Sequence, residues 1–99
     1  MYAVIFTSRL ADRHDGYDAA AARMFERSRT MPGFVGIQSA RGADGEGITV
    51  CLWESLEAIA AWRDDPEHRD VQAQGAREWY ERYRLLVCEV LDDREGPAR

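Results

Sequence analysis

The sequence predicts an α+β domain with the element order β-α-β-β-α-β, the ferredoxin-like arrangement in which helices pack on a four-stranded antiparallel sheet. Three observations lead to this prediction. Four short runs are rich in β-branched and aromatic residues, as strands are. The segments between them carry apolar residues at helical spacing. The chain has 99 residues, 45% of them hydrophobic, which suits one domain with one core.

The first half of the chain supplies two strands and one helix. Tyr2–Ser8 is expected to be a strand, and it is mostly apolar on both faces. After a polar loop, Asp15 is placed to cap an amphipathic helix over Tyr17–Thr30. Pro32-Gly33 ends that helix, and the second strand is expected over 34–41.

The second half begins with a hairpin. Residues 42–47 contain three glycines and predict the hairpin loop, and Ile48–Trp53 is the third strand. Ser55 has the side chain of an N-cap for a helix of about two turns that runs through Trp62. A single hairpin followed by a capped helix is the expected centre of this fold.

The sequence Asp64-Asp65-Pro66 divides the second helical region. Pro66 suits the first turn of a new helix capped by Asp65, and this helix is expected to reach Trp79 or Tyr80. Arg84–Leu91 is the predicted last strand. The domain is therefore expected over residues 1–92, with 93–99 as a flexible C-terminal tail.

The strand composition predicts an assembly. Helices cover only one face of such a sheet, yet the first, third and last strands are apolar on both faces. Exposed apolar area costs roughly 25 cal/mol per Å², so a second copy is expected to cover the open face. We predict an obligate homodimer joined through its sheet faces around a two-fold axis.

The two cysteines are expected to be free thiols. In this topology the first strand separates the strands that carry Cys51 and Cys88, so we predict no disulfide. Few cysteines fit a reducing compartment, and the sequence has neither an export signal nor a membrane-spanning apolar run. We therefore expect a cytoplasmic protein without a membrane partner.

Composition excludes several classes of function. The net charge of −5 argues against a nucleic-acid partner. All 13 basic residues are arginine, which excludes a lysine Schiff base and a Walker phosphate loop. Zinc-binding spacings, the G-x-S-x-G elbow and the G-x-G-x-x-G turn are also missing. We expect neither a metal nor a cofactor.

The stretch 46–83 resembles the antibiotic biosynthesis monooxygenase (ABM) family, and the resemblance extends over residues 2–92. The matching features are Met31-Pro32-Gly33-Phe34, Trp53 with Glu54-Ser55, the run to Trp62, Pro66-Glu67-His68, Gln72 and the pair Trp79-Tyr80. The resemblance implies a dimeric α+β barrel. It also implies three kinds of activity: cofactor-free oxidation of aromatic polyketide-like molecules by dioxygen, haem degradation, or a reaction on quinones.

A pocket between the sheet and the helices is the expected site. His68, Gln72 and Trp79 follow one another at spacings that place them on one face of a helix. In the functional interpretation His68 is a catalytic general base or an orienting group, and Gln72 donates a hydrogen bond to the substrate. In the alternative, His68 is a surface residue of the first helical turn beside Asp64 or Asp65.

Aromatic and hydroxyl side chains complete the expected substrate-binding set. Trp62 is placed to stack on a flat ligand or to fill the core. Trp79 and Tyr83 lie at the corner between helix and strand, where they pack or line the pocket, and Tyr83 offers a hydroxyl. Ser8 and Arg41, near strand ends, are further candidates.

These observations lead to two functional hypotheses from different classes. The first is a cofactor-independent monooxygenase acting on a small aromatic, polyketide-like or quinone-like molecule. The second is a non-catalytic dimeric protein that binds a small molecule or is associated with stress. Haem chemistry is less favoured, because the family's haem-site asparagine, tryptophan and histidine correspond to Ser8, Trp62 and Gln72, and Gln72 is a poor iron ligand.

Overall fold

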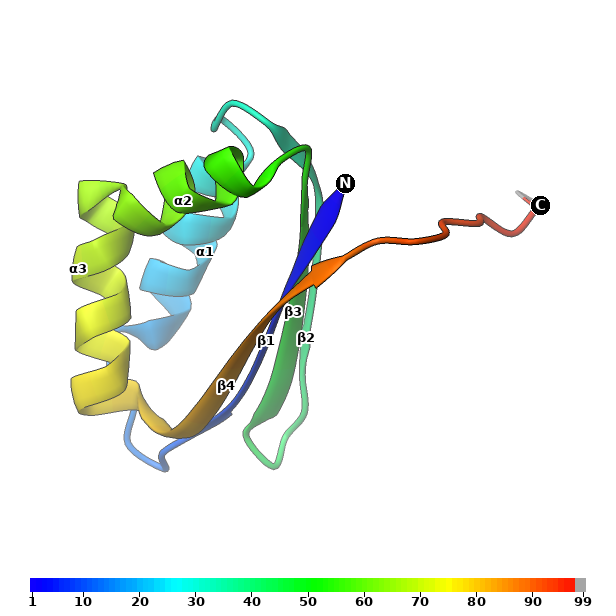
Figure 1. The fold of residues 1–99 in the computed structure, drawn as a ribbon. Coiled ribbons are helices and arrows are strands. Elements are labelled where there is room, and N and C mark those ends of the chain that lie inside the picture. The colour runs from blue at the N-terminus through cyan, green and yellow to red at the C-terminus, as the bar shows by residue number, and fades with distance from the viewer. Residues whose placement is uncertain (98–99) are drawn as a thin grey trace.

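Two layers make up the domain in a computed structural model that describes residues 1–97 (Figure 1). A four-stranded antiparallel sheet with the order β2-β3-β1-β4 carries all the helices on one face. The elements are β1 (Tyr2–Leu10), α1 (Tyr17–Ser28), β2 (Phe34–Arg41), β3 (Glu46–Trp53), α2 (Leu56–Asp64), α3 (Pro66–Gln74), a π-helical turn η1 (Gly75–Trp79) and β4 (Tyr80–Glu89). The predicted ferredoxin-like fold is confirmed.

Helix α1 begins differently from the prediction. Its N-cap is Gly16, in a left-handed conformation with φ of 85°, and no side chain caps the helix. The predicted cap Asp15 instead pairs its carboxylate with Arg13 at 3.3 Å. Glycine adopts a positive φ without strain, so the chain turns into α1 at this residue without the side-chain cap.

The break between α2 and α3 follows the prediction. The Ser55 hydroxyl accepts a hydrogen bond from the backbone N–H of Ala58 at 3.1 Å. The Asp65 carboxylate accepts one from the backbone N–H of His68 at 3.1 Å, and Pro66 occupies the first turn. Each cap satisfies an otherwise unpaired N–H at the start of its helix. The Asp65 cap thereby fixes the position of His68 in the first turn of α3.

Strand β4 begins at Tyr80 and not at the predicted Arg84, and it ends at Glu89 instead of Leu91. Its length is set by its neighbour, because β1 reaches Leu10 and pairs with β4 from Tyr80 to Glu89. The π-helical turn η1 immediately before β4 ends the helical region at Trp79. Local composition does not show this pairing, since it joins the two ends of the chain.

The sheet has one covered face and one open face. Trp53 contacts Trp62 of α2, so Trp53 and its same-face neighbours Cys51 and Val4 belong to the helix-covered side. On the opposite side, apolar residues remain exposed, with Ile48 at 45%. Both faces are therefore apolar, as the strand composition predicts.

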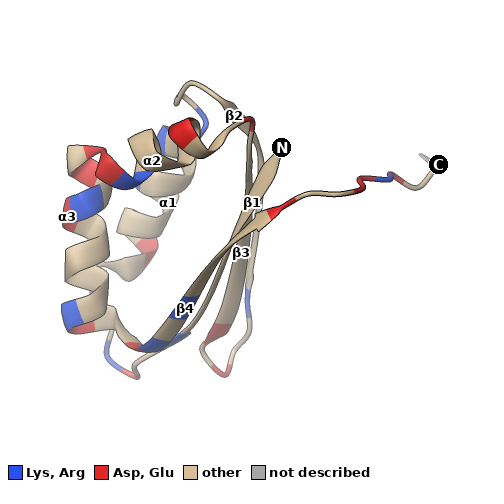
Figure 2. Cartoon of the chain, viewed as in Figure 1, with Lys and Arg blue, Asp and Glu red and all other residues tan. Residues whose placement is uncertain are grey.

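Charges of both signs are spread over the helices and the strands (Figure 2). Residues 90–97 form neither helix nor strand and project from the body (Figure 1). The last two residues of the predicted tail, 98–99, lie outside the described part of the chain. Cys51 and Cys88 are free thiols, as predicted. Within residues 1–97, no helix combines the length and apolarity needed to cross a membrane.

Candidate functional site

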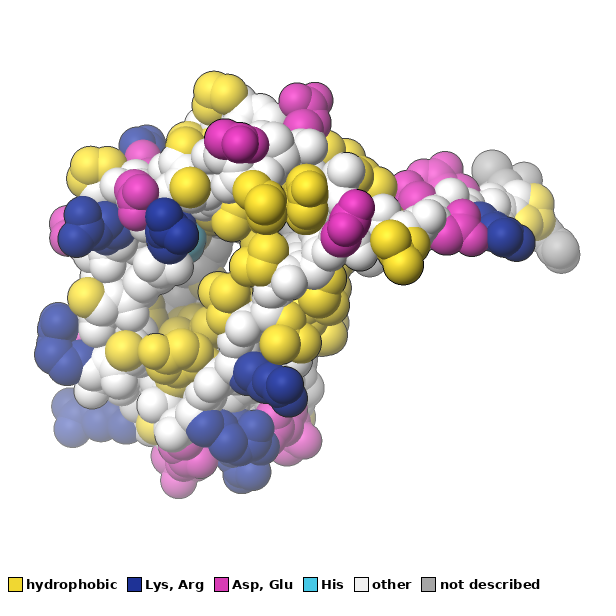
Figure 3. All heavy atoms as spheres, viewed as in Figure 1, with side chains coloured by type: hydrophobic (Ala, Val, Ile, Leu, Met, Phe, Trp, Pro, Cys, Tyr) yellow, Lys and Arg dark blue, Asp and Glu magenta, His cyan; other side chains and the backbone are white. Residues whose placement is uncertain are grey.

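The molecule is hollowed between the helical layer and β4, and hydrophobic side chains gather along the wall (Figure 3). Tyr83, Leu85 and Val87 of β4 lie on the helix-facing side, since they pair with Ser8, Phe6 and Val4 of β1. All three β4 residues are nevertheless exposed, Tyr83 to 57%. The helices therefore leave β4 uncovered, and an open apolar cleft results, which we call the β4 cleft.

One end of the helical layer carries a stack of aromatic rings. The imidazole of His68 lies on the indole of Trp62, with ring centroids 3.9 Å apart and planes 10° apart. Trp62 in turn lies 6.3 Å from the fully buried Trp53 of the sheet. Because Trp62 contacts the helix-covered face of the sheet, His68 stands on the inner side of the helical layer. His68 thus lies on the indole face of Trp62, the face that was expected to stack on a ligand.

The hydrogen bond of His68 fixes its tautomer. Its Nδ1 lies 2.9 Å from the backbone oxygen of Trp62. A carbonyl oxygen only accepts, so Nδ1 carries the hydrogen and Nε2 of the neutral ring carries the lone pair. Burial lowers the pKa of His68, against the opposing effects of the Trp62 carbonyl and the Asp65 charge. The ring is therefore neutral at pH 7, with Nε2 available as a base.

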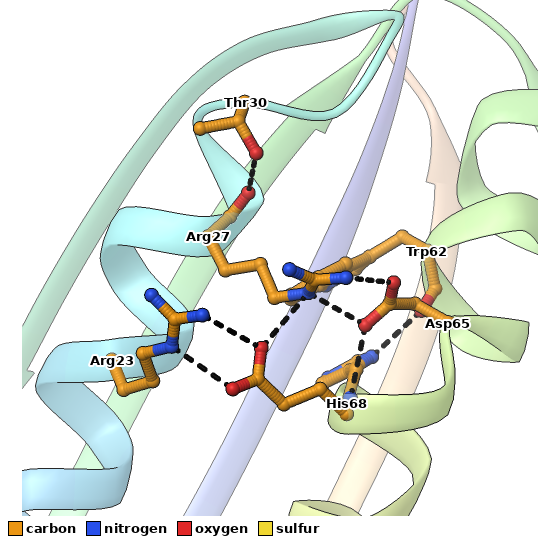
Figure 4. A network of polar contacts seen from close by, with 7 residues as sticks. Arg23, Arg27, Thr30, Trp62, Asp65 and His68 are labelled. Carbon is orange, nitrogen blue, oxygen red and sulfur yellow. Dashed lines mark hydrogen bonds and ion pairs between the residues drawn. The ribbon is translucent and has the colours of Figure 1, made fainter.

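A polar network holds the start of α3 against α1 (Figure 4). Arg27 donates to both oxygens of Asp65, at 2.8 and 2.7 Å, and also lies 3.1 Å from Glu67. Arg23 donates to Glu67 at 2.9 and 3.2 Å. The Arg27 guanidinium lowers the pKa of Asp65 to about 2, so the carboxylate that caps α3 at His68 stays ionised. The network thereby positions the histidine.

A second polar cluster lies at the other end of α1. Arg41 donates from Nη2 to the Ser8 hydroxyl at 2.7 Å and to the Tyr17 hydroxyl at 3.2 Å, and from Nη1 to the Gly45 oxygen at 2.6 Å. Its guanidinium also lies over the Tyr17 ring, 5.3 Å from the centroid. We call Arg41, Ser8 and Tyr17 the Arg41 cluster. It joins α1 to the β2–β3 hairpin and to β1.

Aromatic contacts link the Arg41 cluster to the β4 cleft. The Tyr17 ring lies 6.0 Å from Tyr80, which lies 5.4 Å from Phe6. The exposed Tyr83 stacks on Phe6 with centroids 5.7 Å apart. Burial raises the pKa of the Tyr80 hydroxyl well above its usual range, so this group stays protonated. The protonated Tyr80 phenol and the Arg41 guanidinium therefore lie at the same end of the domain.

The structure brings only some of the predicted site residues together. His68 and Trp62 stand together, one on the other. Tyr83 borders the β4 cleft, and Ser8, 1% exposed, uses its hydroxyl to hold Arg41. Gln72 is exposed on α3, one turn beyond His68, and has no side-chain hydrogen bond among the described residues.

Trp79 takes the packing role, one of the two that were expected for it. It is 2% exposed, its indole N–H donates to the Asp15 oxygen at 2.9 Å, and its ring meets Tyr17 edge to face. It therefore packs the corner between α1 and β4 and is almost wholly buried.

Sequence reasoning missed the role of Tyr17 and named Arg41 only as a further candidate. Tyr17 was considered only as the first residue of an amphipathic helix. Its hydroxyl was the available signal, because a tyrosine on the inner face of a helix needs a polar partner for its O–H. That partner comes from β2, far along the chain, so the pairing itself depends on the fold.

Other concave surfaces lie away from the helices. Two shallow hollows of about 530 and 470 Å³ lie along β2 and β3, where Ala40 and Ile48 line both. In addition, no three His, Cys, Asp or Glu side chains within residues 1–97 are grouped so that they can hold a metal ion. Arg41 also borders the first of the two hollows, whereas His68, Trp62 and Tyr83 border neither.

Comparison with known proteins identifies the family. The sequence model described as antibiotic biosynthesis monooxygenase matches residues 1–74. The chain belongs to the ABM family. The match ends before η1, so it includes His68 and Gln72 but not the pair Trp79-Tyr80.

One curated relative of this ABM protein is uncharacterized protein YqjZ of Bacillus subtilis. The two are 44% identical over 89 residues, which is 90% of this chain and 78% of YqjZ. This identity extends the family relationship through most of β4, beyond the matched segment.

Solved structures share the fold of this ABM protein at low identity. Rv0793 from Mycobacterium tuberculosis superposes with a TM-score of 0.83 at 21% identity, covering 95% of this chain and 98% of Rv0793. SnoaB from Streptomyces nogalater, described as a cofactor-independent oxygenase, superposes with a TM-score of 0.78 at 12% identity, covering 93% and 94%. These likenesses support the fold of the ABM chain.

Proposed function

We propose that this ABM-family protein is a cofactor-independent monooxygenase that oxidises a small aromatic, polyketide-like or quinone-like molecule. The observation that carries the proposal is the neutral His68, whose Nδ1 is bonded to the Trp62 carbonyl while Nε2 keeps its lone pair. A neutral base on the inner side of the helical layer suits removal of a proton from a weakly acidic C–H or phenol. The description of SnoaB as a cofactor-independent oxygenase supports the same reaction class.

The proposed reaction needs no external reductant. His68 Nε2 takes a proton from an activated CH₂ group, and the resulting carbanion gives one electron to dioxygen. The substrate radical and superoxide combine into a C–O bond, and a proton from His68 completes the hydroperoxide. Loss of the second C–H proton breaks the O–O bond and releases water. The balance is R₂CH₂ + O₂ → R₂C=O + H₂O, with all four electrons from the substrate.

The chain's own contribution is to hold a flat anion away from water. Trp62 with His68 forms one aromatic surface, and Phe6 with Tyr83 forms another. Such surfaces orient a planar substrate, and an apolar cleft strengthens electrostatic contacts with the developing charge.

We also propose that the protein works as a homodimer in the cytoplasm. The exposed apolar residues of the open sheet face, including Ile48 and Leu86, support burial against a second copy. The free thiols Cys51 and Cys88 fit a reducing compartment.

Oxygen uptake with a panel of anthrones and hydroquinones tests the reaction. The His68→Phe variant keeps a flat ring on Trp62 but removes the base, so kcat/KM is expected to fall by at least about 100-fold. Because burial lowers the pKa of His68, the acid limb of the wild-type kcat/KM profile is expected below pH 6.5.

The matched control is His14→Gln. His14 also bonds a backbone carbonyl through Nδ1, that of Ala11 at 2.7 Å, but it lies in the loop before α1. Its uptake rate is expected to equal that of the wild type. Equal rates for His68→Phe and the wild type would remove His68 from the mechanism. Binding of the panel without any oxygen uptake would favour a non-catalytic binding protein, and a stoichiometric Soret band with added haem would favour a haem protein.

A further inference from the structure

The Arg41 cluster holds a cation that lacks a carboxylate partner. Within residues 1–97, the ion pairs of the protein do not include Arg41. Glu46, at the start of β3, pairs instead with Arg9 and Arg82. The four hydrogen bonds of Arg41 all go to neutral oxygens, two of backbone carbonyls and two of hydroxyls. No carboxylate within residues 1–97 therefore neutralises the positive charge of the half-buried guanidinium.

The backbone around Arg41 is shaped to hold the guanidinium in place. A Cβ atom on Gly47 would lie 2.4 Å from Arg41 Cζ, so the guanidinium lies flat against the glycine. The Gly45 oxygen and the buried Ser8 hydroxyl fix its two terminal nitrogens. An arginine fixed by contacts from two strands and a helix presents its charge in one direction, which a mobile surface arginine does not.

The hydroxyls around Arg41 are left as hydrogen-bond donors. A guanidinium has no lone pair, so the Tyr17 oxygen accepts from Arg41. The Tyr17 hydroxyl also raises the pKa of Tyr80 through their side-chain contact. Whichever of these two hydroxyls donates to the other, one O–H hydrogen of the pair remains available. The protonated Tyr80 lies next to Tyr17, and both rings lead through Phe6 to the β4 cleft. Phenol donors backed by a positive charge form the arrangement that stabilises an anionic oxygen.

We propose that the Arg41 cluster, with Tyr80, binds an anionic oxygen of the substrate at the end of the β4 cleft away from His68. The inference rests on the proposed function and names the substrate class: a flat aromatic molecule that carries a negative oxygen. That oxygen is either a permanent carboxylate or a phenol or enol hydroxyl that ionises in the site. The Tyr17–Tyr80 pair donates to it, Arg41 supplies the charge and Ser8 keeps Arg41 in position.

Isothermal titration calorimetry with three naphthalene probes tests the proposal without requiring turnover. The probes are naphthalene-2-carboxylate, 2-naphthol and the neutral 2-methoxynaphthalene. The wild type is expected to bind the carboxylate roughly tenfold or more tightly than the methoxy compound, as a charge-assisted hydrogen bond predicts. Ultraviolet absorption of bound 2-naphthol distinguishes the sources: a naphtholate spectrum identifies an ionised hydroxyl, and an unchanged spectrum identifies a carboxylate.

Two variants locate the site. Arg41→Met is expected to remove the preference for the carboxylate while leaving the affinity for 2-methoxynaphthalene unchanged. Tyr17→Phe keeps the ring against Trp79 and Tyr80, and it is expected to reduce the preference several-fold. It also tests the proposal if Arg41→Met fails to fold, which circular dichroism would reveal.

Arg29→Met is the matched control, because Arg29 also lies over an aromatic ring, that of Phe25 at 5.9 Å, but it follows the last residue of α1, at the opposite end of the helix from Tyr17. It is expected to keep the wild-type preference. His68→Phe is also expected to keep the preference for the carboxylate, so the binding result can be interpreted even if the oxygenase proposal fails. Equal wild-type affinities for the carboxylate and methoxy probes, or a preference that survives in both Arg41→Met and Tyr17→Phe, would overturn the proposal.

Discussion

At the scale of single residues, the site depends on how one histidine is held. The Trp62 carbonyl fixes the proton on Nδ1, and Asp65 caps the helix at the histidine's own N–H. Arg27 keeps Asp65 ionised through two short hydrogen bonds. The His68 ring is therefore placed by groups on its own backbone, on Trp62 and in the Asp65–Arg27 pair, and these groups are open to separate tests.

The first such test concerns pH and stability. The folded state lowers the pKa of Asp65 from 3.8 to about 2, so ionised Asp65 stabilises the fold. This contribution is complete above about pH 4, and it is lost as pH falls through about 2. Asp65→Asn keeps a capping side chain but removes the charge, so its loss of stability relative to the wild type is expected to shrink steadily between pH 4 and pH 2.

Urea unfolding at several pH values measures this difference. Asp64→Asn provides the control, because Asp64 is an exposed neighbour whose one ion pair within residues 1–97 is with Arg63 at 3.2 Å. Its stability relative to the wild type is expected to stay nearly constant over the same range. A pH-independent difference for Asp65→Asn would contradict the role given to the Arg27 pair.

At the scale of elements, the turn before β2 sets how α2 packs. Gly33 has φ of 85°, and a Cβ atom there would lie 2.5 Å from the Cβ of Ala58 on α2. Its oxygen accepts from the Glu54 N–H at 2.8 Å, at the end of β3. The segment 31–34 that resembles the ABM family thus brings the start of β2, the end of β3 and α2 together.

Gly33→Ala is therefore expected to lower the free energy of unfolding by roughly 1–3 kcal/mol, because alanine adds both backbone strain and a clash with Ala58. Urea denaturation measures the loss. Gly36→Ala, in the adjoining strand with open space around its Cβ position, is expected to stay within about 0.5 kcal/mol of the wild type. Similar effects of the two substitutions would contradict this account of the turn.

Much of the fold could be predicted from local sequence. The main errors of the prediction come from contacts between distant parts of the chain and from one backbone conformation. The caps at Ser55 and Asp65 were predictable, since a capping side chain and the N–H it binds are three residues apart. The start of β4 was not, because its pairing partner Leu10 lies near the other end of the chain. The missing Asp15 cap has a different cause, the left-handed turn at Gly16.

The candidate site follows the same division. The stack of His68 on Trp62 was within reach of the sequence, since both flank the break at 64–66. Sequence spacing also placed Gln72 beside His68, but it could not show that α3 leaves Gln72 exposed. The Arg41 cluster joins residues from β1, α1 and β2, so only the folded structure brings its charge and hydroxyls together.

At the scale of the whole molecule, the open sheet face determines the expected assembly. Ile48 and Leu86 lie on the side without helices, exposed to 45% and 39%. Their partners in the register are Thr7 and Ile5 of the central strand β1, so the exposed residues border a continuous surface. Burial of such a surface by a second copy is the simplest way to remove it from water.

Size-exclusion chromatography with light scattering is expected to give twice the chain mass for the wild type. Ile48→Arg places a charge in the middle of the open face, and it is expected to shift the protein to the monomer. Leu56→Arg changes an equally exposed leucine on α2 and is expected to remain dimeric. A wild-type monomer at micromolar concentration would contradict the assembly.

The position of β1 in the sheet also has a consequence for synthesis. β1 is made first and pairs with β3 on one edge, but its other edge belongs to β4, the last strand of the chain. While the nascent chain on the ribosome lacks Tyr80–Glu89, a half-built sheet leaves the backbone groups of that edge of β1 unpaired. The sheet is therefore complete only once Tyr80–Glu89 has been made, and chains cut short before this strand present an open strand edge to other polypeptides.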